Sequence, residues 1–228
     1  MALALIERTP GLAARERIYL TLREAITTAE LVPGRRLSEN ELAGQLGVSR
    51  TPIREALALL REERLVAIVP QLGTFVTRIS PSAIADAAFV REALECAAVR
   101  LAAERIESAA LAELQANLAL QADAEPARFH GLDDDFHRLL CEASGHPVAW
   151  ALAHRANGQL DRLRRLSLPE PAYRQEMVDE HHDVLAAVAE LDPDRAERTL
   201  RHHLRMVPSL LGALQARHPD FFEEDPHA

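Results

Sequence analysis

Residues 38–79 contain a series of local signals whose order restricts the fold more than any other feature of the chain. Ser38-Glu39-Asn40-Glu41 is a capping box, in which the serine oxygen accepts a hydrogen bond from an amide in the first helical turn. Gly47-Val48-Ser49 then turns the chain, and its serine can cap a second helix at about 50–63. Two short β-branched stretches follow, at 65–69 and 74–79. This order predicts a helix-turn-helix with a β-hairpin wing.

The second helix of this motif has an apolar stripe that leaves its first residues outside the core. Ile53 and Leu57 lie on the stripe, whereas Arg50, Thr51 and Arg54 lie off it, near the helix start. The first residues of a recognition helix meet base edges in the major groove of DNA. Arginine there can pair with guanine, and threonine can contact a phosphate or a thymine methyl group. The alternative is a solvated helix face.

Other residues of the first 79 fit the same interpretation. A helix at 12–30 is ended by Pro33-Gly34 and precedes the motif. Arg35 and Arg36 can hold phosphates, and Gly73 at the hairpin tip lets the backbone approach a phosphate or the minor groove.

The chain after Ile79-Ser80-Pro81 has a different pattern, because every later segment has helical periodicity. We expect a mainly α protein: a winged helix-turn-helix domain at 1–79, an all-α antiparallel bundle of about six helices at 80–217, and an acidic, frayed tail at 218–228. The six helices are expected near 82–105, 107–122, 126–144, 147–166, 171–190 and 193–215.

Charge separates the two parts. Residues 1–79 hold 11 Arg and 9 Asp plus Glu and are slightly basic. The whole chain has a net charge of −9, so the negative charge lies in the later part, which also holds all ten His, after residue 129. Such asymmetry indicates two separate functions. Without an apolar run long enough for a membrane span, or a signal peptide in Met1–Arg8, we expect a cytoplasmic protein with no membrane partner. Cys96 and Cys141 are expected to be buried, reduced thiols.

Four potential metal ligands lie on inward faces of three helices. Asp133 and His137 are four residues apart, and His181 and His203 each fall within an apolar stripe of their own helix. A shared divalent cation would satisfy all four buried groups. The set suits Zn²⁺, Ni²⁺, Mn²⁺ or Fe²⁺ and does not choose among them, although zinc is the ion that we expect. The alternative is that each histidine is a core residue with its own hydrogen bond. His182 lies at the margin of its stripe.

The first third of the chain resembles a known family. The stretch IYLTLREAITTAELVPGRRLSENELAGQLGVSRTPIREALALLREERLVAIVPQLGTFV, and SRTPIREAL above all, resembles the winged helix-turn-helix of the GntR family of bacterial regulators. The resemblance implies that Arg50, Thr51 and Arg54 contact the operator and that Gly73 lies at the wing tip. Asn40 stands where the family often has arginine; it can still bond adenine or phosphate, so a DNA contact is expected there too.

The second part resembles the FCD ligand-binding domain of the FadR subfamily, in the stretches DDDFHRLLCEASG, DEHHDVLAAVAELD and AERTLRHHLRMV. The resemblance implies metal ligands at Asp133, His137, His181 and His203, and six helices suit its VanR-like branch. It also implies a small organic or sugar acid bound beside the metal. His146 stands where the family usually has asparagine and can alter the pocket or cap the next helix.

An anionic effector favours arginine as a further contact. Arg91 is the leading candidate, followed by Arg162 and Arg165, and a surface or salt-bridge role is the alternative for each.

Together these features predict an effector-controlled DNA-binding regulator and not an enzyme. We expect a repressor that binds a palindromic double-stranded operator as a homodimer. One alternative is a metal-dependent phosphohydrolase of the HD type, suggested by the His182-Asp183 pair. Another is a regulator whose metal site is purely structural.

Overall fold

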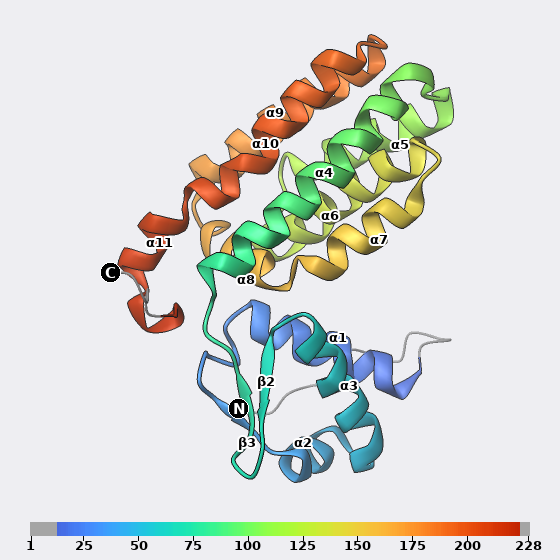
Figure 1. The fold of residues 1–228 in the computed structure, drawn as a ribbon. Helices are drawn as coiled ribbons and strands as arrows, with labels where there is room; N and C mark the ends of the chain where they lie inside the picture. The colour runs from blue at the N-terminus through green and yellow to red at the C-terminus, as the bar shows by residue number, and fades with distance from the viewer. Residues whose placement is uncertain (1–12, 224–228) are drawn as a thin grey trace. The chain divides into compact units, whose positions relative to one another are not determined.

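The computed structural model describes residues 13–223, so Met1–Arg8 lie outside the described part of the chain. The described residues form two compact units (Figure 1). The chain passes from unit 1 to unit 2 between Pro81 and Ser82, and returns to unit 1 between Leu214 and Gln215.

Unit 1 contains the predicted helix-turn-helix and wing. Its elements are α1 (Ala14–Thr27), β1 (Arg36–Leu37), α2 (Glu39–Leu46), α3 (Arg50–Glu62), β2 (Val66–Val69) and β3 (Gly73–Val76). The three strands form an antiparallel sheet in the order β1-β3-β2, in which Val66 faces Val76 and Arg36 faces Phe75. The short strand β1 was not predicted. One apolar core, with Ile18, Ile53 and Leu60 fully buried, holds the helices against the sheet.

The local signals of the motif act largely as expected. Ser38 Oγ accepts from the amide of Glu41 at 3.4 Å, and Gly47 ends α2 in the left-handed conformation with φ 65°. Ser49 occupies the N-cap position of α3 but makes no side-chain capping bond, so that expectation was wrong. Helix α1 ends at Thr27, before Pro33-Gly34, because the chain turns there through a positive φ at Ala29.

Unit 2 is all-helical, as expected. Its helices are α4 (Pro81–Arg105), α5 (Ser108–Gln121), α6 (Pro126–Ala143), α7 (Pro147–Ala156), α8 (Gly158–Ser167), α9 (Pro171–Ala189), α10 (Pro193–Ser209) and α11 (Leu211–Arg217). α6, α7, α9 and α10 each begin with proline, which loses no hydrogen bond there and already has a helical φ.

All six predicted segments are helical, but two of them are divided. The segment 147–166 is interrupted at Asn157-Gly158, two residues with low helix propensity. The segment 193–215 is interrupted after Pro208, which lacks an N–H and crowds the preceding turn. Residues 81–217 therefore hold eight helices.

The chain beyond α11 is ordered as far as Glu223, which corrects the expectation of a frayed tail from residue 218. A short 3-10 helix covers Pro219–Phe221. Ile79 N–H donates to the carbonyl of Phe221 at 2.8 Å, and Glu223 N–H donates to that of Ile79 at 3.0 Å. Phe222 is buried. Backbone pairing and burial of one aromatic ring thus hold this segment in unit 1, while 224–228 lie outside the described residues.

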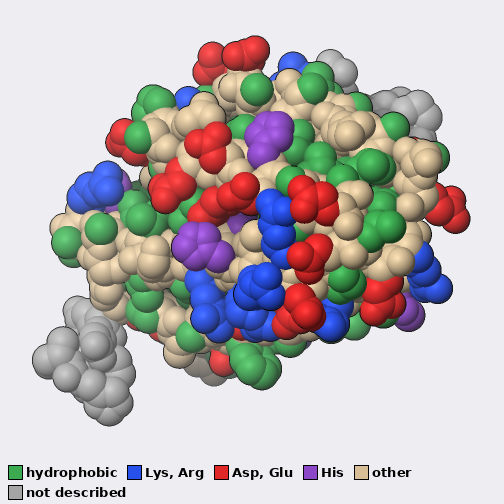
Figure 2. All heavy atoms as spheres, turned by 90° about the horizontal axis from the view of Figure 1, so that it is seen from above, with side chains coloured by type: hydrophobic (Ala, Val, Ile, Leu, Met, Phe, Trp, Pro, Cys, Tyr) green, Lys and Arg blue, Asp and Glu red, His purple; other side chains and the backbone are tan. Residues whose placement is uncertain are grey.

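Several exposed charges on unit 2 form ion pairs between helices. Glu92 of α4 accepts from Arg205 of α10 at 2.8 Å, and Arg100 donates to Glu197 at 3.2 Å. In the view of Figure 2, basic side chains lie next to acidic ones. Cys96 and Cys141 are buried free thiols as expected, and burial raises the pKa of each to about 12. Within residues 13–223 no helix is both long and apolar enough to cross a membrane.

Candidate functional site

The predicted DNA-contacting end of α3 is accessible. Arg50, Thr51 and Arg54 are exposed, with 54% of the Arg50 side chain and 62% of the Arg54 side chain open to solvent. The opposite face of α3 packs into the core of unit 1. In Figure 1, α2 and the turn between β2 and β3 lie at the same end of unit 1. This end of the unit can meet a duplex without rearrangement of the core.

The other predicted DNA-contacting residues lie at β1, in the first turn of α2 and at the start of β3. Arg35 and Arg36 are exposed, as is Asn40 in the first turn of α2. Gly73 has a φ of +124°, and a Cβ at this position would lie 3.0 Å from Arg36 Nε. The positive φ therefore favours glycine at this position, and a larger residue would also displace the Arg36 side chain slightly. DNA contact by these residues stays a prediction.

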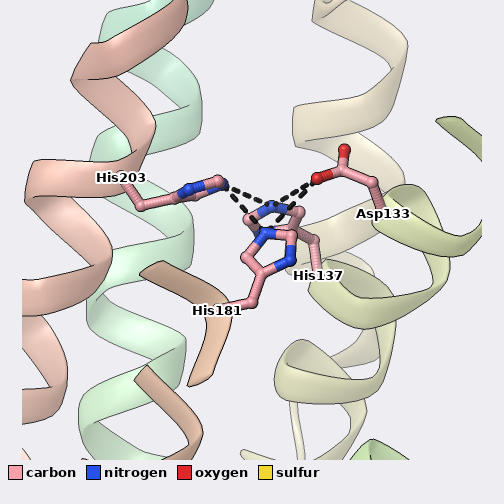
Figure 3. Close-up of side chains that lie close together, drawn as sticks. All are labelled: Asp133, His137, His181 and His203. Carbon is pink, nitrogen blue, oxygen red and sulfur yellow. Dashed lines mark hydrogen bonds and ion pairs between the residues drawn. The ribbon is translucent and has the colours of Figure 1, made fainter. Parts of the chain in front are cut away.

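Asp133, His137, His181 and His203 meet in the core of unit 2 (Figure 3). Asp133 and His137 come from α6, His181 from α9 and His203 from α10, and none is more than 2% exposed. One ligand atom from each residue lies within 4.8 Å of all the others. The sequence prediction that these four side chains converge is thus confirmed by the geometry.

The three imidazoles turn the same nitrogen toward the centre. His203 Nε2 lies 3.1 Å from His181 Nε2 and 3.2 Å from His137 Nε2, and Asp133 Oδ1 lies 3.3 Å from His181 Nε2. Two nitrogen ligands about 2.1 Å from one ion lie about 3.0–3.4 Å apart at octahedral or tetrahedral angles. The observed separations between the imidazole nitrogens therefore match ligands of a single ion.

Each outward nitrogen faces an acceptor. His137 Nδ1 lies 2.7 Å from Glu95 Oε2, and His203 Nδ1 lies 2.9 Å from Glu180 Oε2. His181 Nδ1 lies 2.8 Å from the side-chain oxygen of Gln121, whose amide nitrogen donates to Asn117 Oδ1 at 2.7 Å. These acceptors, on α4, α5 and α9, place the imidazole protons on Nδ1. Such outer partners fix the tautomer of metal-binding histidines.

Electrostatics at the centre favour a cation. Burial lowers the pKa of His181 and His203 well below the usual value, so both rings are neutral at pH 7. A neutral imidazole that donates from Nδ1 has only a lone pair on Nε2. Asp133 Oδ1 has no hydrogen-bond partner within residues 13–223, and it lies 3.3 Å from His181 Nε2. Three lone pairs and a carboxylate oxygen facing one another in the core are a costly arrangement, and a divalent ion would relieve it.

Arg164 is a component of this region that the sequence interpretation missed. It is 2% exposed and pairs with three carboxylates: Asp133, Asp134 at 3.0 Å and Asp161 at 2.8 Å. It therefore offsets the charge of the candidate ligand Asp133 from the side opposite the histidines. Its position one helical turn after the buried Leu160 was a signal that could have identified it.

A second group of potential ligands, His130, Asp134 and Asp161, lies beside the first. The guanidinium of Arg164 already bonds both of these carboxylates. We therefore assign this group to an ion-pair network and not to a second ion.

Two of the arginines predicted to bind an effector are in the core. Arg91 and Arg162 are each 2% exposed, and Arg165 is half-buried. Arg91 Nε donates to Glu95 Oε1 at 2.7 Å, so this arginine is linked to the candidate ligand His137 through one carboxylate. Its Nη2 is buried and has no hydrogen-bond partner within the described residues. Burial lowers the pKa of Arg162 to about 10.

Asn157, which the sequence interpretation also missed, lies between α7 and α8 with an exposed fraction of 0%. Neither its Nδ2 nor its Oδ1 has a hydrogen-bond partner within the described residues. A helix-start asparagine normally caps its own helix, but Asn157 makes no capping bond. Its amide is therefore a buried donor and acceptor that nothing in the protein's fold explains.

The remaining singled-out histidines lie at the surface. His146 is exposed at the N-cap of α7 and makes no capping bond there. His182 and Asp183 are both exposed, so the pair that suggested an HD-type hydrolase does not enter the core. His202 is exposed and lies 3.2 Å from Glu180 Oε1.

Comparisons with known proteins agree with this architecture. Residues 14–76 match the bacterial regulatory proteins of the gntR family, and residues 86–206 match the FCD domain. Two solved structures share the fold. E. coli McbR/YncC superposes with a TM-score of 0.76 at 23% identity, covering 89% of this chain and 99% of its own. A GntR regulator from Rhodococcus sp. RHA1 gives 0.67 at 26% identity, covering 87% and 98%.

Two sequence relatives extend over nearly the whole chain. An uncharacterized HTH-type transcriptional regulator in an unstable DNA locus of Streptomyces ambofaciens is 42% identical over 220 residues, which cover 96% of this chain and 93% of the relative. The HTH-type transcriptional repressor RspR of Escherichia coli K12 is 32% identical over 220 residues, which cover 95% and 96%. The chain therefore belongs to the GntR family of bacterial transcriptional regulators, in the FadR subfamily with an FCD domain, and is a DNA-binding regulator rather than an enzyme.

Proposed function

We propose that this regulator is a metal-dependent sensor of a small carboxylate. In this proposal a cytoplasmic homodimer represses transcription from a palindromic operator, and an organic or sugar acid bound beside a divalent metal controls its affinity for DNA. The observation that carries the proposal is the buried group of three imidazole Nε2 atoms and the Asp133 oxygen, which face one another in the core of unit 2.

Asp133, His137, His181 and His203 would hold the ion, and zinc suits them, with nickel, manganese and iron as alternatives. When bound, the metal would supply positive charge and open coordination positions for an anionic oxygen. The protein supplies the rest: Glu95, Gln121 and Glu180 fix the imidazoles, and Arg164 holds the carboxylate of Asp133.

Two buried groups support a polar ligand next to the metal. Arg91 Nη2 is a charged donor without a partner among the described residues, and guanidinium N–H groups bind carboxylates strongly. Asn157 lies one helical turn before Asp161, on the inward face of α8 that also carries Arg164. An effector carboxylate at Arg91 and an effector hydroxyl at Asn157 would satisfy both. Arg162 and Arg165 remain secondary candidates.

Contacts with DNA are proposed for the half-buried Gly73 and for six exposed residues of unit 1: Arg35, Arg36, Asn40, Arg50, Thr51 and Arg54. A dimer would place two such surfaces on the two halves of a palindrome. Repression is proposed because RspR of Escherichia coli K12 and NanR of Edwardsiella tarda, which is 30% identical over 215 residues, are both named repressors.

The proposal is tested with a duplex selected from a random-sequence library by the wild-type protein. Metal-stripped protein and zinc-loaded protein are titrated with the labelled duplex, each with and without members of a panel of organic and sugar acids. We expect at least one acid to weaken DNA binding by about 5- to 150-fold, and only when the metal is present. If no acid changes DNA affinity although the metal binds, the metal is structural and the sensing role is wrong.

Asn157 provides a separate prediction on stability. Asn157→Ala removes a buried amide without partners, so the free energy of unfolding of the effector-free protein should stay constant or rise by up to about 1 kcal/mol. Asn117→Ala is the matched control, because Asn117 bonds both the Leu132 carbonyl and Gln121. It should lower that free energy by about 1–3 kcal/mol. Denaturant unfolding measures both, and equal losses would contradict the role given to Asn157.

A further inference from the structure

Glu39, the first residue of α2, joins both arginines that begin the recognition helix. Its Oε2 atom accepts from Arg50 Nη2 at 3.0 Å and from Arg54 Nε at 2.7 Å. The two arginines lie one helical turn apart on α3, on the other side of the Gly47 turn from Glu39. One carboxylate oxygen therefore sets the spacing of two guanidinium groups.

The contact leaves both arginines able to bind DNA. Arg54 uses Nε for Glu39, so its terminal Nη1 and Nη2 edge is not engaged by this carboxylate. Arg50 uses only Nη2. Both side chains stay more than half exposed, at 54% and 62%, whereas that of Glu39 is 27% exposed. Glu39 therefore holds both guanidinium groups in place and leaves N–H groups of each that it does not engage.

Glu39 also carries a negative charge close to the surface that would meet phosphates. Burial alone would raise its pKa, but the hydrogen bonds from Arg50 and Arg54 outweigh this and lower the pKa below the usual value. The carboxylate is thus ionised at neutral pH. A fixed negative charge beside the arginines opposes indiscriminate phosphate binding, which supplies most non-specific affinity.

We infer that Glu39 is a positioning residue that sets the sequence specificity of this regulator, by holding Arg50 and Arg54 in place for base contacts and by penalising backbone-only binding. The inference rests on the DNA contacts assigned to these arginines in the proposed function. Two physical effects combine in it: less side-chain freedom is lost when the bases are bound, and binding to the wrong sequence is disfavoured.

The test compares two duplexes of equal length, one selected by the wild-type protein from a random library and one of random sequence. Binding of each is measured by fluorescence anisotropy at two salt concentrations. Glu39→Gln should lower the ratio of the two affinities by about tenfold, within the discrimination that one arginine–guanine pair provides. Glu55→Gln is the matched control, since Glu55 is exposed beside Arg54 and its loss changes the net charge equally. Its ratio should equal that of the wild type.

A second variant separates position from charge. Glu39→Asp keeps the charge but is one methylene too short to hold both arginines, so it should also lower the ratio. The inference is overturned if both variants keep the wild-type ratio. It is also overturned if only Glu39→Gln lowers the ratio, because charge alone would then explain the effect. Circular dichroism of each variant checks that unit 1 is folded.

The variant Arg50→Ala distinguishes the DNA contact made by the arginine from the positioning role of Glu39. If Arg50→Ala binds the selected duplex as well as the wild type does, the DNA contact itself is wrong. If Arg50→Ala loses binding while both Glu39 variants keep the ratio, only the positioning role of Glu39 is wrong.

Discussion

Arg50→Ala should abolish specific DNA binding: its affinity for the selected duplex should fall by a factor of about 100 or more. An arginine that pairs with guanine contributes about 1–3 kcal/mol of discrimination, and a dimer would lose this contact in both half-sites. The fold should not change, because 54% of the Arg50 side chain is exposed and its ion-pair partner Glu39 lies outside the core. Fluorescence anisotropy measures the affinity, and the thermal melting curve checks the fold.

The control for this prediction is Arg61→Ala on the same helix. Arg61 is exposed in the last turn of α3, so its replacement removes the same charge far from the helix start. It should weaken binding of selected and random duplexes by the same small factor. An Arg50→Ala protein that behaves like Arg61→Ala would show that Arg50 contributes only general electrostatic attraction.

His181→Ala should remove the metal. His181 Nε2 is a central atom of the cluster, and its Nδ1 is already fixed by Gln121. Loss of an outer partner alone costs about 10- to 100-fold in metal affinity, and loss of a ligand should cost at least about 100-fold. Metal content after dialysis against zinc, measured by mass spectrometry, should fall from one ion per chain to a small fraction of that.

The neighbouring histidines provide two matched controls. His182 follows His181 on α9 and is exposed, and His202 precedes His203 on α10 with 79% of its side chain exposed. Alanine at either position should leave one ion per chain. Full metal content in folded His181→Ala would remove His181 from the ligand set.

The regular elements could be predicted from the sequence because each is marked locally. The capping box and Gly47 define the first helix of the motif, and apolar periodicity together with N-terminal prolines defines four helices of unit 2. Strand β1 could not be predicted, since two residues carry no periodicity and pair only because β3 is beside them. The ordering of Phe222 depends on Ile79, which is distant in the sequence.

The four candidate ligands could be predicted because each interrupts an apolar stripe with a polar side chain. The groups that orient them could not. Glu95 lies on a helix whose buried face mixes alanine with charged residues, so its inward position has no distinct pattern. The contact of Glu39 with Arg50 and Arg54 likewise depends on side-chain rotamers across a turn, which periodicity does not encode.

X-ray absorption spectroscopy of the zinc-loaded wild-type protein tests the metal centre directly. We expect one ion per chain, with three imidazole nitrogens and carboxylate oxygen at about 2.0–2.2 Å in its coordination shell. The His181→Ala protein should not give this spectrum. A wild-type protein that binds no zinc, or a first shell without imidazole scattering, would contradict the metal centre from which the proposed sensing role follows.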